Sequence, residues 1–330
     1  MRGGLVALLT LGLVGVADAA PAGFVGTLAA RGLDESSGLV KSRAHDGVFW
    51  SHNDSGGKAQ LFAVGPTGED RGVVDVTGAR AQDWEDIAVD PQGNLWIHDG
   101  GNNANKRRDL TVYRIPEPEA LSGTVAADRA IRFHYPEQTE FPPAARNFDS
   151  EALFWDGGRM YLLTKHRGDT ETALYVFPAG FEDAPAPASG GDSTPASLPL
   201  ERLGSFDVGG DRGNYGGMVT AADLSPDGQH LAILTYHAIF VFSRPPDVAS
   251  GEGESSGAAS SGGEASSESV NWLAGPSRRI GLAQPLTVQC EAIAWDGGAL
   301  LFTNEGRAVM RIDAPLDAAC TSFPSKTCAP

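Results

Sequence analysis

Carboxylate side chains occupy the same position in three copies of a repeated sequence pattern. Glu85, Glu151 and Glu291 begin apolar runs in Trp-Glu-Asp-Ile-Ala, Ser-Glu-Ala-Leu and Cys-Glu-Ala-Ile-Ala. If the copies bring these carboxylates to about 5 Å from one another at an effective dielectric constant of about 20, the three pairs repel by about 10 kcal/mol. That energy is comparable to the whole stability of a typical domain. The carboxyls must therefore share protons or bind a cation.

The cation that such a group favours is Ca2+, because oxygen ligands of flexible geometry suit it best. Mg2+ is the second choice, and a softer transition metal is disfavoured since no His or Cys spacing accompanies the acids. In the fourth copy the equivalent residue is Ala222, where its backbone carbonyl, Thr220 or a water would have to supply the oxygen. In the alternative interpretation each glutamate caps backbone N–H groups and binds no metal. The predicted metal ligands form an axial ring of Ser37, Glu85, Glu151, Ala222 and Glu291.

Five copies of one structural unit carry these residues. Each unit has a small or acidic residue, an apolar strand, a Gly-containing turn, a second strand and a polar cluster. A third strand follows each pair, at residues 60–64, 110–115, 173–177, 239–242 and 309–312. The fifth copy has little chain left for its outer strand, which residues 24–30 could supply. The sequence therefore predicts an all-β, five-bladed β-propeller closed by its N-terminal strand; six blades and a β-sandwich are the alternatives.

The first residues are typical of a secretory signal peptide. Arg2 precedes an apolar run from Leu5 to Val16, and a small-residue site follows at residues 17–19. The run is shorter than the roughly 20 residues of a spanning helix. We expect a signal peptide over residues 1–19, a secreted or periplasmic protein with no transmembrane segment, one domain over residues 20–315 and a tail at 316–330. Within the domain, residues 182–198 and 246–269 are predicted to be disordered insertions, because they lack apolar side chains.

The net charge indicates which kinds of partner to expect, and the cysteines indicate the compartment. A formal net charge of -17 repels phosphate backbones and anionic lipid headgroups, so no nucleic-acid partner is expected. The same charge favours metal cations, and we expect a monomer. The three cysteines fit an oxidising compartment, with Cys320 to Cys328 as the favoured bridge and Cys290 as a buried packing residue.

The series of ring residues also resembles a known family. The positions that carry Ser37, Glu85, Glu151, Ala222 and Glu291, with the Ser-Ser-Gly-Leu and Glu-containing contexts quoted above, are similar to the SdiA-regulated family of exported bacterial propellers. The resemblance covers residues 33–312 and implies five blades and an axial calcium. A similar axial arrangement is known in calcium-activated apyrases. Ala222 departs from the Ser or Glu of the family pattern, which leaves the coordination number open.

Polar side chains are expected on the face around this ring. In a propeller the first strand of each blade lines the axis, and the antiparallel second strand returns to the end where the first began. The polar residues of this face are of types that also favour turns, so a purely structural role is the alternative. The predicted ligand-binding residues are Asn53, Asp54, Asp99, Asn102, Lys165, Arg167, Tyr236, His237, Asn304 and Glu305, and the candidate catalytic residues are His52, His98 and His166.

Three functions agree with these features. The favoured one is a binding module in which an axial structural calcium pins the blades and the polar face holds a glycan, a protein, or a polar or anionic small molecule. The alternative is a calcium-dependent hydrolase of phosphate or carboxylic esters, similar to phytases, apyrases or esterases. A purely structural envelope protein is the third. The sequence contains no Gly-x-Ser-x-Gly and no His-Glu-x-x-His motif, so serine-nucleophile and zinc-protease chemistry lack support.

Overall fold

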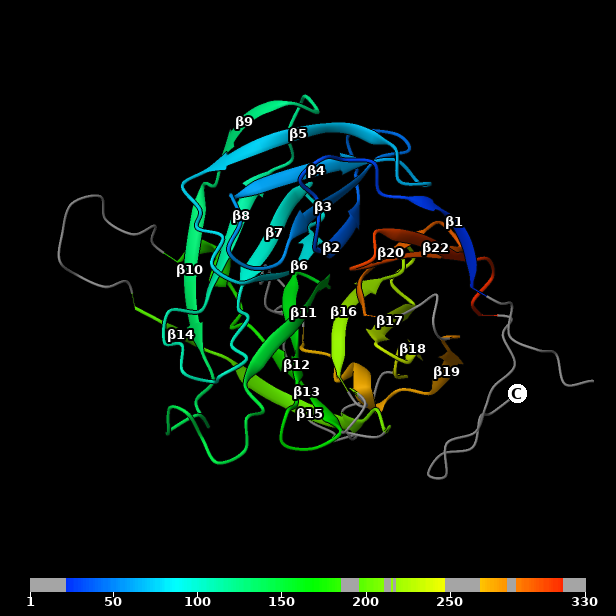
Figure 1. The fold of residues 1–330 in the computed structure, drawn as a ribbon. Coiled ribbons are helices and arrows are strands. Elements are labelled where there is room, and N and C mark those ends of the chain that lie inside the picture. The colour runs from blue at the N-terminus through cyan, green and yellow to red at the C-terminus, as the bar shows by residue number, and fades with distance from the viewer. Residues whose placement is uncertain are drawn as a thin grey trace, which may run out of the picture.

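Five antiparallel sheets surround a central axis in the computed structural model, which describes residues 22–184, 196–210, 215, 218–246, 268–283 and 289–316 (Figure 1). Each sheet is one blade of four main strands, counted from the axis outward. Blade 1 contains β2 (Ser36–Lys41), β3 (Phe49–Asn53), β4 (Gln60–Val64) and β5 (Asp70–Thr77); blade 2 contains β6 (Trp84–Val89), β7 (Asn94–Asp99), β8 (Thr111–Pro116) and β10 (Arg129–His134). Blade 3 contains β11 (Asp149–Asp156), β12 (Arg159–Lys165), β13 (Glu171–Val176) and β15 (Glu201–Asp207); blade 4 contains β16 (Val219–Leu224), β17 (His230–Thr235), β18 (Ala238–Ser243) and β19 (Ser277–Gly281).

Blade 5 closes the propeller with strands from both ends of the described chain. It contains β20 (Cys290–Asp296), β21 (Ala299–Asn304) and β22 (Ala308–Ile312), and β1 (Gly23–Thr27) pairs antiparallel with β22 as its outer strand. The inner strands follow one another around the axis, and β20 packs against β2 to complete the circle. The predicted five-bladed β-propeller with an N-terminal closing strand is thereby confirmed.

The blades form because short apolar strands alternate with turns that the sequence can make tightly. In blade 3, Asp156 pairs with Arg159, so Gly157 and Gly158 alone connect β11 to β12. Both glycines have positive φ angles, 56° and 79°, which a two-residue hairpin of this twist requires. Each hairpin returns the chain to the end of the blade where it began, and this return is what brings polar side chains back to the axis.

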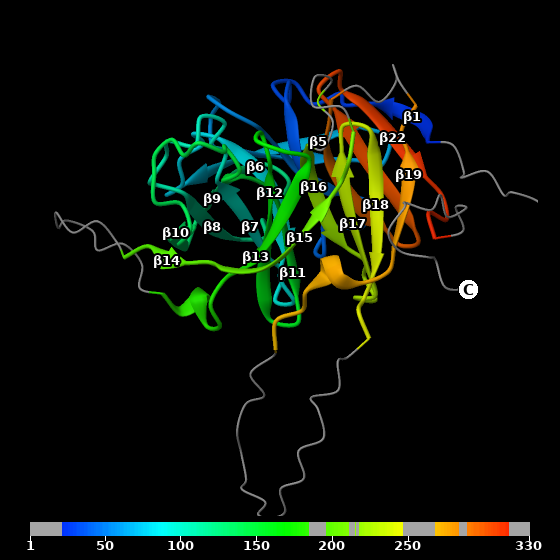
Figure 2. The same ribbon diagram turned by 90° about the horizontal axis from the view of Figure 1, so that it is seen from below.

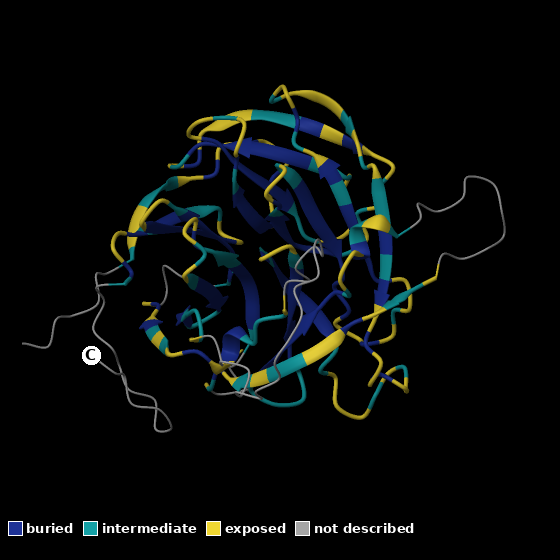
Figure 3. Cartoon of the chain, turned by 180° about the vertical axis from the view of Figure 1, so that it is seen from behind, coloured by how far each residue is buried: buried dark blue, intermediate teal, exposed yellow. Residues whose placement is uncertain are grey.

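The hydrophobic core lies between the blades rather than in one central mass. Five clusters of buried apolar side chains each join two neighbouring blades, and the inner strands are almost wholly buried (Figure 3). Cys290 belongs to the cluster between blades 4 and 5, where its side chain is buried as expected. Burial raises the pKa of its thiol to about 12, so the thiol stays protonated at neutral pH.

Two short strands cross from one blade to the outer edge of the preceding blade. β9 (Gly123–Ala126) pairs parallel with β5, and β14 (Leu198–Pro199) pairs parallel with β10 (Figure 2). Two single-turn 3-10 helices, η1 (Phe181–Asp183) and η3 (Trp272–Ala274), lie in the connections of blades 3 and 4. Within the predicted disordered insertion at 182–198, Ala184 and Leu198 near its two ends pack against the apolar cluster between blades 2 and 3.

Several predictions fall outside the described residues. These are the signal peptide, the central parts of both insertions, the C-terminal tail and the Cys320 to Cys328 bridge. No helix among the residues that are described is long and apolar enough to cross a membrane.

Candidate functional site

A β-bulge in the inner strand of each blade positions the residues nearest the axis. The extra residue lies near the start of each inner strand, for example between Ser150 and Ala152 in β11. A bulge turns one side chain out of the regular alternation of the strand. The bulge residues of the five blades, named here the bulge ring, are Ser37, Glu85, Thr220, Glu151 and Glu291.

The bulge register corrects one predicted ligand. In β16 the register shift falls between Val219 and Ala221, so Thr220 and not Ala222 is equivalent to the glutamates. Ala222 is two residues further along and has another role. Its backbone N–H donates to the buried carboxylate of Asp86, which also accepts the backbone N–H of Leu153. Asp86 thus joins blades 2, 3 and 4 across the axis, although burial raises its pKa well above the ordinary value.

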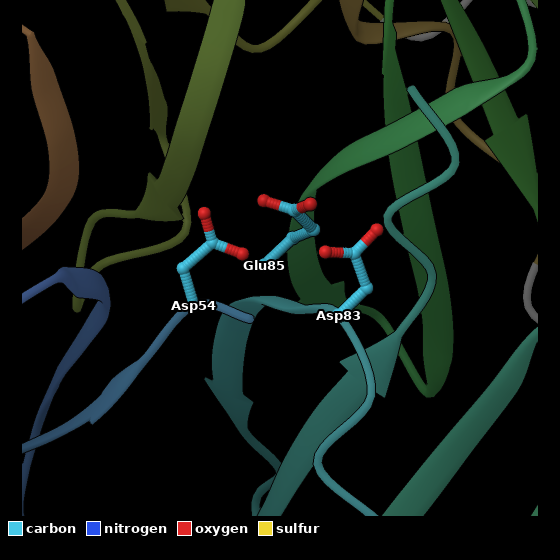
Figure 4. A group of neighbouring side chains, drawn as sticks. All are labelled: Asp54, Asp83 and Glu85. Carbon is cyan, nitrogen blue, oxygen red and sulfur yellow. The ribbon is translucent and has the colours of Figure 1, made fainter. Parts of the chain in front are cut away.

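Three carboxylates converge beside the bulge ring and form what we name the acid triad: Asp54, Asp83 and Glu85 (Figure 4). One oxygen from each lies within 4.8 Å of the others. Asp54 follows β3 of blade 1, whereas Asp83 and Glu85 flank the start of β6 in blade 2. The two segments are joined by an antiparallel bridge between Ser55 and Asp83, and this bridge holds the carboxylates face to face.

Glu85 is the innermost acid of the triad, with an exposed fraction of 5%. Among the described residues no hydrogen bond or ion pair of its carboxylate is found, and Asp54 Oδ1 is the oxygen of the triad that is buried without a hydrogen-bond partner. Burial raises the pKa of Glu85 well above the ordinary value, and the charges of Glu151 and Asp54 raise it further. A buried carboxylate without a donor is costly unless it is protonated or meets a cation.

The other two acids of the triad are partly exposed and share the same electrostatic stress. Burial, followed by repulsion from Asp83 and Glu291, raises the pKa of Asp54 to about 7. Burial likewise raises the pKa of Asp83, even though Arg107 opposes the shift. Gly101 makes their approach to Glu85 possible, because a Cβ on this residue would lie 2.1 Å from Glu85 Oε1 and 2.5 Å from Asp83 Oδ2.

The remaining residues of the bulge ring have partners within the protein. The hydroxyl of Ser37 donates to the carbonyl of Glu85 at 2.8 Å, and that of Thr220 donates to the carbonyl of Cys290 at 2.8 Å. Each of these two hydroxyls therefore links neighbouring blades.

The two other glutamates of the ring meet a lysine and a tyrosine. Lys165 Nζ lies 2.7 Å from Glu151 Oε2, and Tyr236 donates its hydroxyl to Glu291 Oε1 at 2.7 Å. The predicted five-residue ring therefore does not converge as one set of ligands, and Glu85 is the ring residue that lies with the acid triad.

Several predicted ligand-binding residues hold the loops of this face in place. Asn53 accepts the backbone N–H groups of Asp34 and Glu35, and Asn304 accepts that of Ala308. Among the others, Asn102 accepts the backbone N–H groups of Lys106 and Arg107, and Asp99 pairs with Arg107 at 2.9 Å, while Arg167 pairs with Asp149 at 2.9 Å. His237 lies at the same end of blade 4, and Glu305 is exposed, with its pKa raised by burial and by the charge of Glu291.

The candidate catalytic histidines are buried. His52 and His98 have no exposed surface, and burial lowers their pKa values to about 4 and about 3. Their ring nitrogens Nδ1 lie 3.0 Å from the carbonyl of Asn53 and 3.3 Å from that of Asp86. His166 is also buried and pairs with Asp169 at 2.6 Å. With no exposed surface, neither His52 nor His98 reaches the open face in this structure, and proton transfer by His52, His98 or His166 stays a prediction.

The acid triad has the donor set of a site for a hard divalent cation. Two oxygens bound to one Ca2+ at about 2.4 Å each can be up to about 4.8 Å apart, which agrees with the spacing in the triad. Three carboxylates supply at most six of the six to eight oxygens that Ca2+ takes. A cation held here would keep coordination positions for water or for an oxygen of a ligand on the exposed side of Asp54.

Sequence reasoning missed Asp83 as a site residue. The signal was present, because Asp83 and Glu85 are two residues apart at the start of a strand, where alternate side chains share a face. The predicted site counted one acid per repeat, and Asp83 does not fit that rule.

Solved structures similar to this chain include several with low TM-scores. Virginiamycin B lyase from Staphylococcus aureus is 12% identical with a TM-score of 0.37, and the match covers 87% of this chain and 68% of that chain. A candidate 6-phosphogluconolactonase from Bacteroides uniformis is 13% identical with a TM-score of 0.34, with 81% and 63% covered, so this chain spans less than two thirds of it. A candidate gluconolactonase is 13% identical with a TM-score of 0.39, with 92% and 94% covered. No protein-family model matches the chain, and no curated protein matches it.

Proposed function

We propose that this protein is an exported, calcium-binding β-propeller that uses the acid triad to hold one Ca2+ and to present it to an oxygen-bearing ligand. The observation that carries the proposal is the convergence of three carboxylates, in which Asp54 Oδ1 is buried without a hydrogen-bond partner and Glu85 is 5% exposed (Figure 4). The N-terminal sequence pattern supports export. A polar ligand such as a glycan, or a carboxylate of a peptide, would complete the coordination of the cation.

The charges around the triad support a cation for a second reason. Asp99 and Asp149 at this face are neutralised by Arg107 and Arg167, and Glu151 by Lys165. Among the described residues no acid of the triad forms an ion pair, and Glu291 accepts the hydroxyl of Tyr236 and is influenced by the charges of Lys165 and Arg167. The face therefore carries an excess of negative charge, which attracts a divalent cation and repels a free anion.

A binding role agrees with this site better than hydrolysis. The histidines that a hydrolase would use for proton transfer are buried, with lowered pKa values. The ammonium of Lys165 and the guanidinium of Arg167 are engaged by carboxylates and are not presented to a substrate. The resemblance to the SdiA-regulated family stays a prediction.

Isothermal titration of calcium into EDTA-stripped mature protein tests the proposal. We expect one Ca2+ per chain in the wild type and at least a tenfold loss of affinity in Glu85→Gln, because a buried ligand is lost. Glu201→Gln is the matched control, since it removes the same charge from an exposed position on β15. Equal affinity in the wild type and Glu85→Gln, or no binding in the wild type, would contradict the proposal.

A further inference from the structure

One side chain of the acid-rich face is a buried cation rather than an anion. The side chain of Lys165 is 6% exposed, and its Nζ lies 2.7 Å from Glu151 Oε2. The hydroxyl of Tyr236 is 3.5 Å from the same nitrogen and connects it to Glu291. The ammonium thus pairs with the glutamate of blade 3 and is linked through the hydroxyl of Tyr236 to that of blade 5.

The position of Lys165 in the repeat shows that the charge there changes from blade to blade. Lys165 follows directly on the residue that pairs with Ser150, and Asp54 follows directly on the residue that pairs with Ser36. The two side chains are therefore equivalent in blades 3 and 1. Blade 1 uses this position for an acid of the triad, whereas blade 3 uses it for a cation.

We propose that Lys165 is a built-in substitute for a second metal ion: its ammonium, paired with Glu151 and linked to Glu291 through the hydroxyl of Tyr236, fills a position where a divalent cation would otherwise bind, so that the face binds one cation and not two. The inference rests on the proposed function for its count of one metal in the wild type. Its second part, the latent site, depends only on Lys165, Glu151 and Glu291.

The physical reason is the match between the ammonium and a small cation. Both are compact positive charges that carboxylate oxygens surround, and Glu151 is buried too deeply to reach bulk water, with 1% of its side chain exposed. Removing the ammonium leaves Glu151 with the guanidinium of Arg167 at 4.0 Å and Glu291 with the hydroxyl of Tyr236, beside the buried carboxylate of Glu85. An added divalent cation can then replace the charge of the ammonium without a change of fold.

Calcium titration of Lys165→Gln tests the inference, with Lys58→Gln as the control because Lys58 is exposed on the same blade as Asp54. We expect Lys58→Gln to bind as the wild type does and Lys165→Gln to bind one more Ca2+ per chain than the wild type. A wild type that binds none while Lys165→Gln binds one would defeat the proposed function and support the inference. An unchanged stoichiometry in Lys165→Gln would overturn the inference and leave the proposed function standing.

A measurement on the wild type keeps the inference testable if the variant does not fold. Crystals soaked in Mn2+ should give one anomalous peak at the acid triad and none between Glu151 and Glu291. A peak between those two glutamates in the wild type would overturn the inference, because the lysine would then not exclude the second metal.

Discussion

Buried acids occur at both ends of the propeller axis, and their surroundings differ. At the end where the inner strands finish, the buried acids meet donors: Asp90 accepts the indole N–H of Trp96, and Asp156 accepts that of Trp272 and pairs with Arg244. At the end where the inner strands begin, the buried Oδ1 of Asp54, beside Glu85, has no donor among the described residues. The same residue types thus hold the blades together at one end and leave an uncompensated charge at the other.

The two ends show that hydrogen-bond donors distinguish a buried acid with a structural role from one that can bind a metal. A buried carboxylate that accepts hydrogen bonds is already satisfied and has no need of a cation. One that is buried, crowded by like charges and without a donor is stable only when it is protonated or bound to a metal. Burial alone does not make the distinction; the count of donors does.

The largest expected effect is a loss of stability when a buried acid that has donors is removed. Asp156→Ala removes the acceptor of the Trp272 indole and of Arg244, and we expect a loss of about 3 kcal/mol in the free energy of unfolding. Urea unfolding measures the loss, and calcium affinity should stay as in the wild type. Glu201→Ala, on the exposed side of β15, is the control and should change stability by less than about 0.5 kcal/mol. A similarly small change in Asp156→Ala would show that acids with donors contribute little to this fold.

An acid with few donors provides an intermediate case through its pH dependence. Burial raises the pKa of Asp223 to about 7, although the backbone N–H of Trp295 donates to its carboxylate and opposes the shift. Because the folded pKa lies above the unfolded value of about 3.9, the stabilisation that this group supplies is complete below pH of about 4 and is lost as the pH rises through about 7. Between pH 5 and pH 8 the wild type should therefore lose on the order of 2 kcal/mol more than Asp223→Asn, which does not titrate.

Urea unfolding of both proteins in EDTA at the two pH values measures this difference. The triad titrates in both proteins, so its contribution cancels in the comparison. Equal losses in the wild type and Asp223→Asn would show that the pKa of Asp223 is not raised in the folded protein.

The smallest expected effect concerns two hydroxyls of the bulge ring that lie near the acid triad and are not expected to bind the cation. Ser37→Ala and Thr220→Val each remove a hydroxyl that donates to a carbonyl of the next blade, and each should cost about 1 kcal/mol. Calcium affinity, measured by titration, should not change in either variant, because both hydroxyls are engaged by the backbone. A tenfold loss of affinity in Ser37→Ala would return Ser37 to the set of metal ligands.

Much of the fold could be predicted from the sequence because residue types at short spacings define the repeat. Apolar runs, Gly-containing turns and a small or acidic residue at the start of each first strand indicated five blades, and the spare strand at residues 24–30 fitted the missing outer strand of the fifth. The residue of blade 4 that is equivalent to the glutamates could not be predicted in the same way. Thr220, Ala221 and Ala222 are all small, and a bulge of one residue shifts the register without leaving a mark on the apolar pattern.

The sequence by itself determined the number of blades, the closing strand and the gathering of acids at one end of the axis, because each depends on residue types at fixed spacings. The tertiary structure decided which acids meet. Asp54 and Asp83 join Glu85 because a bridge between blades 1 and 2 aligns them, and Lys165 reaches Glu151 from the neighbouring strand of blade 3. The balance of charge at one point depends on side chains from separate blades, and their distances are set only when the ring closes.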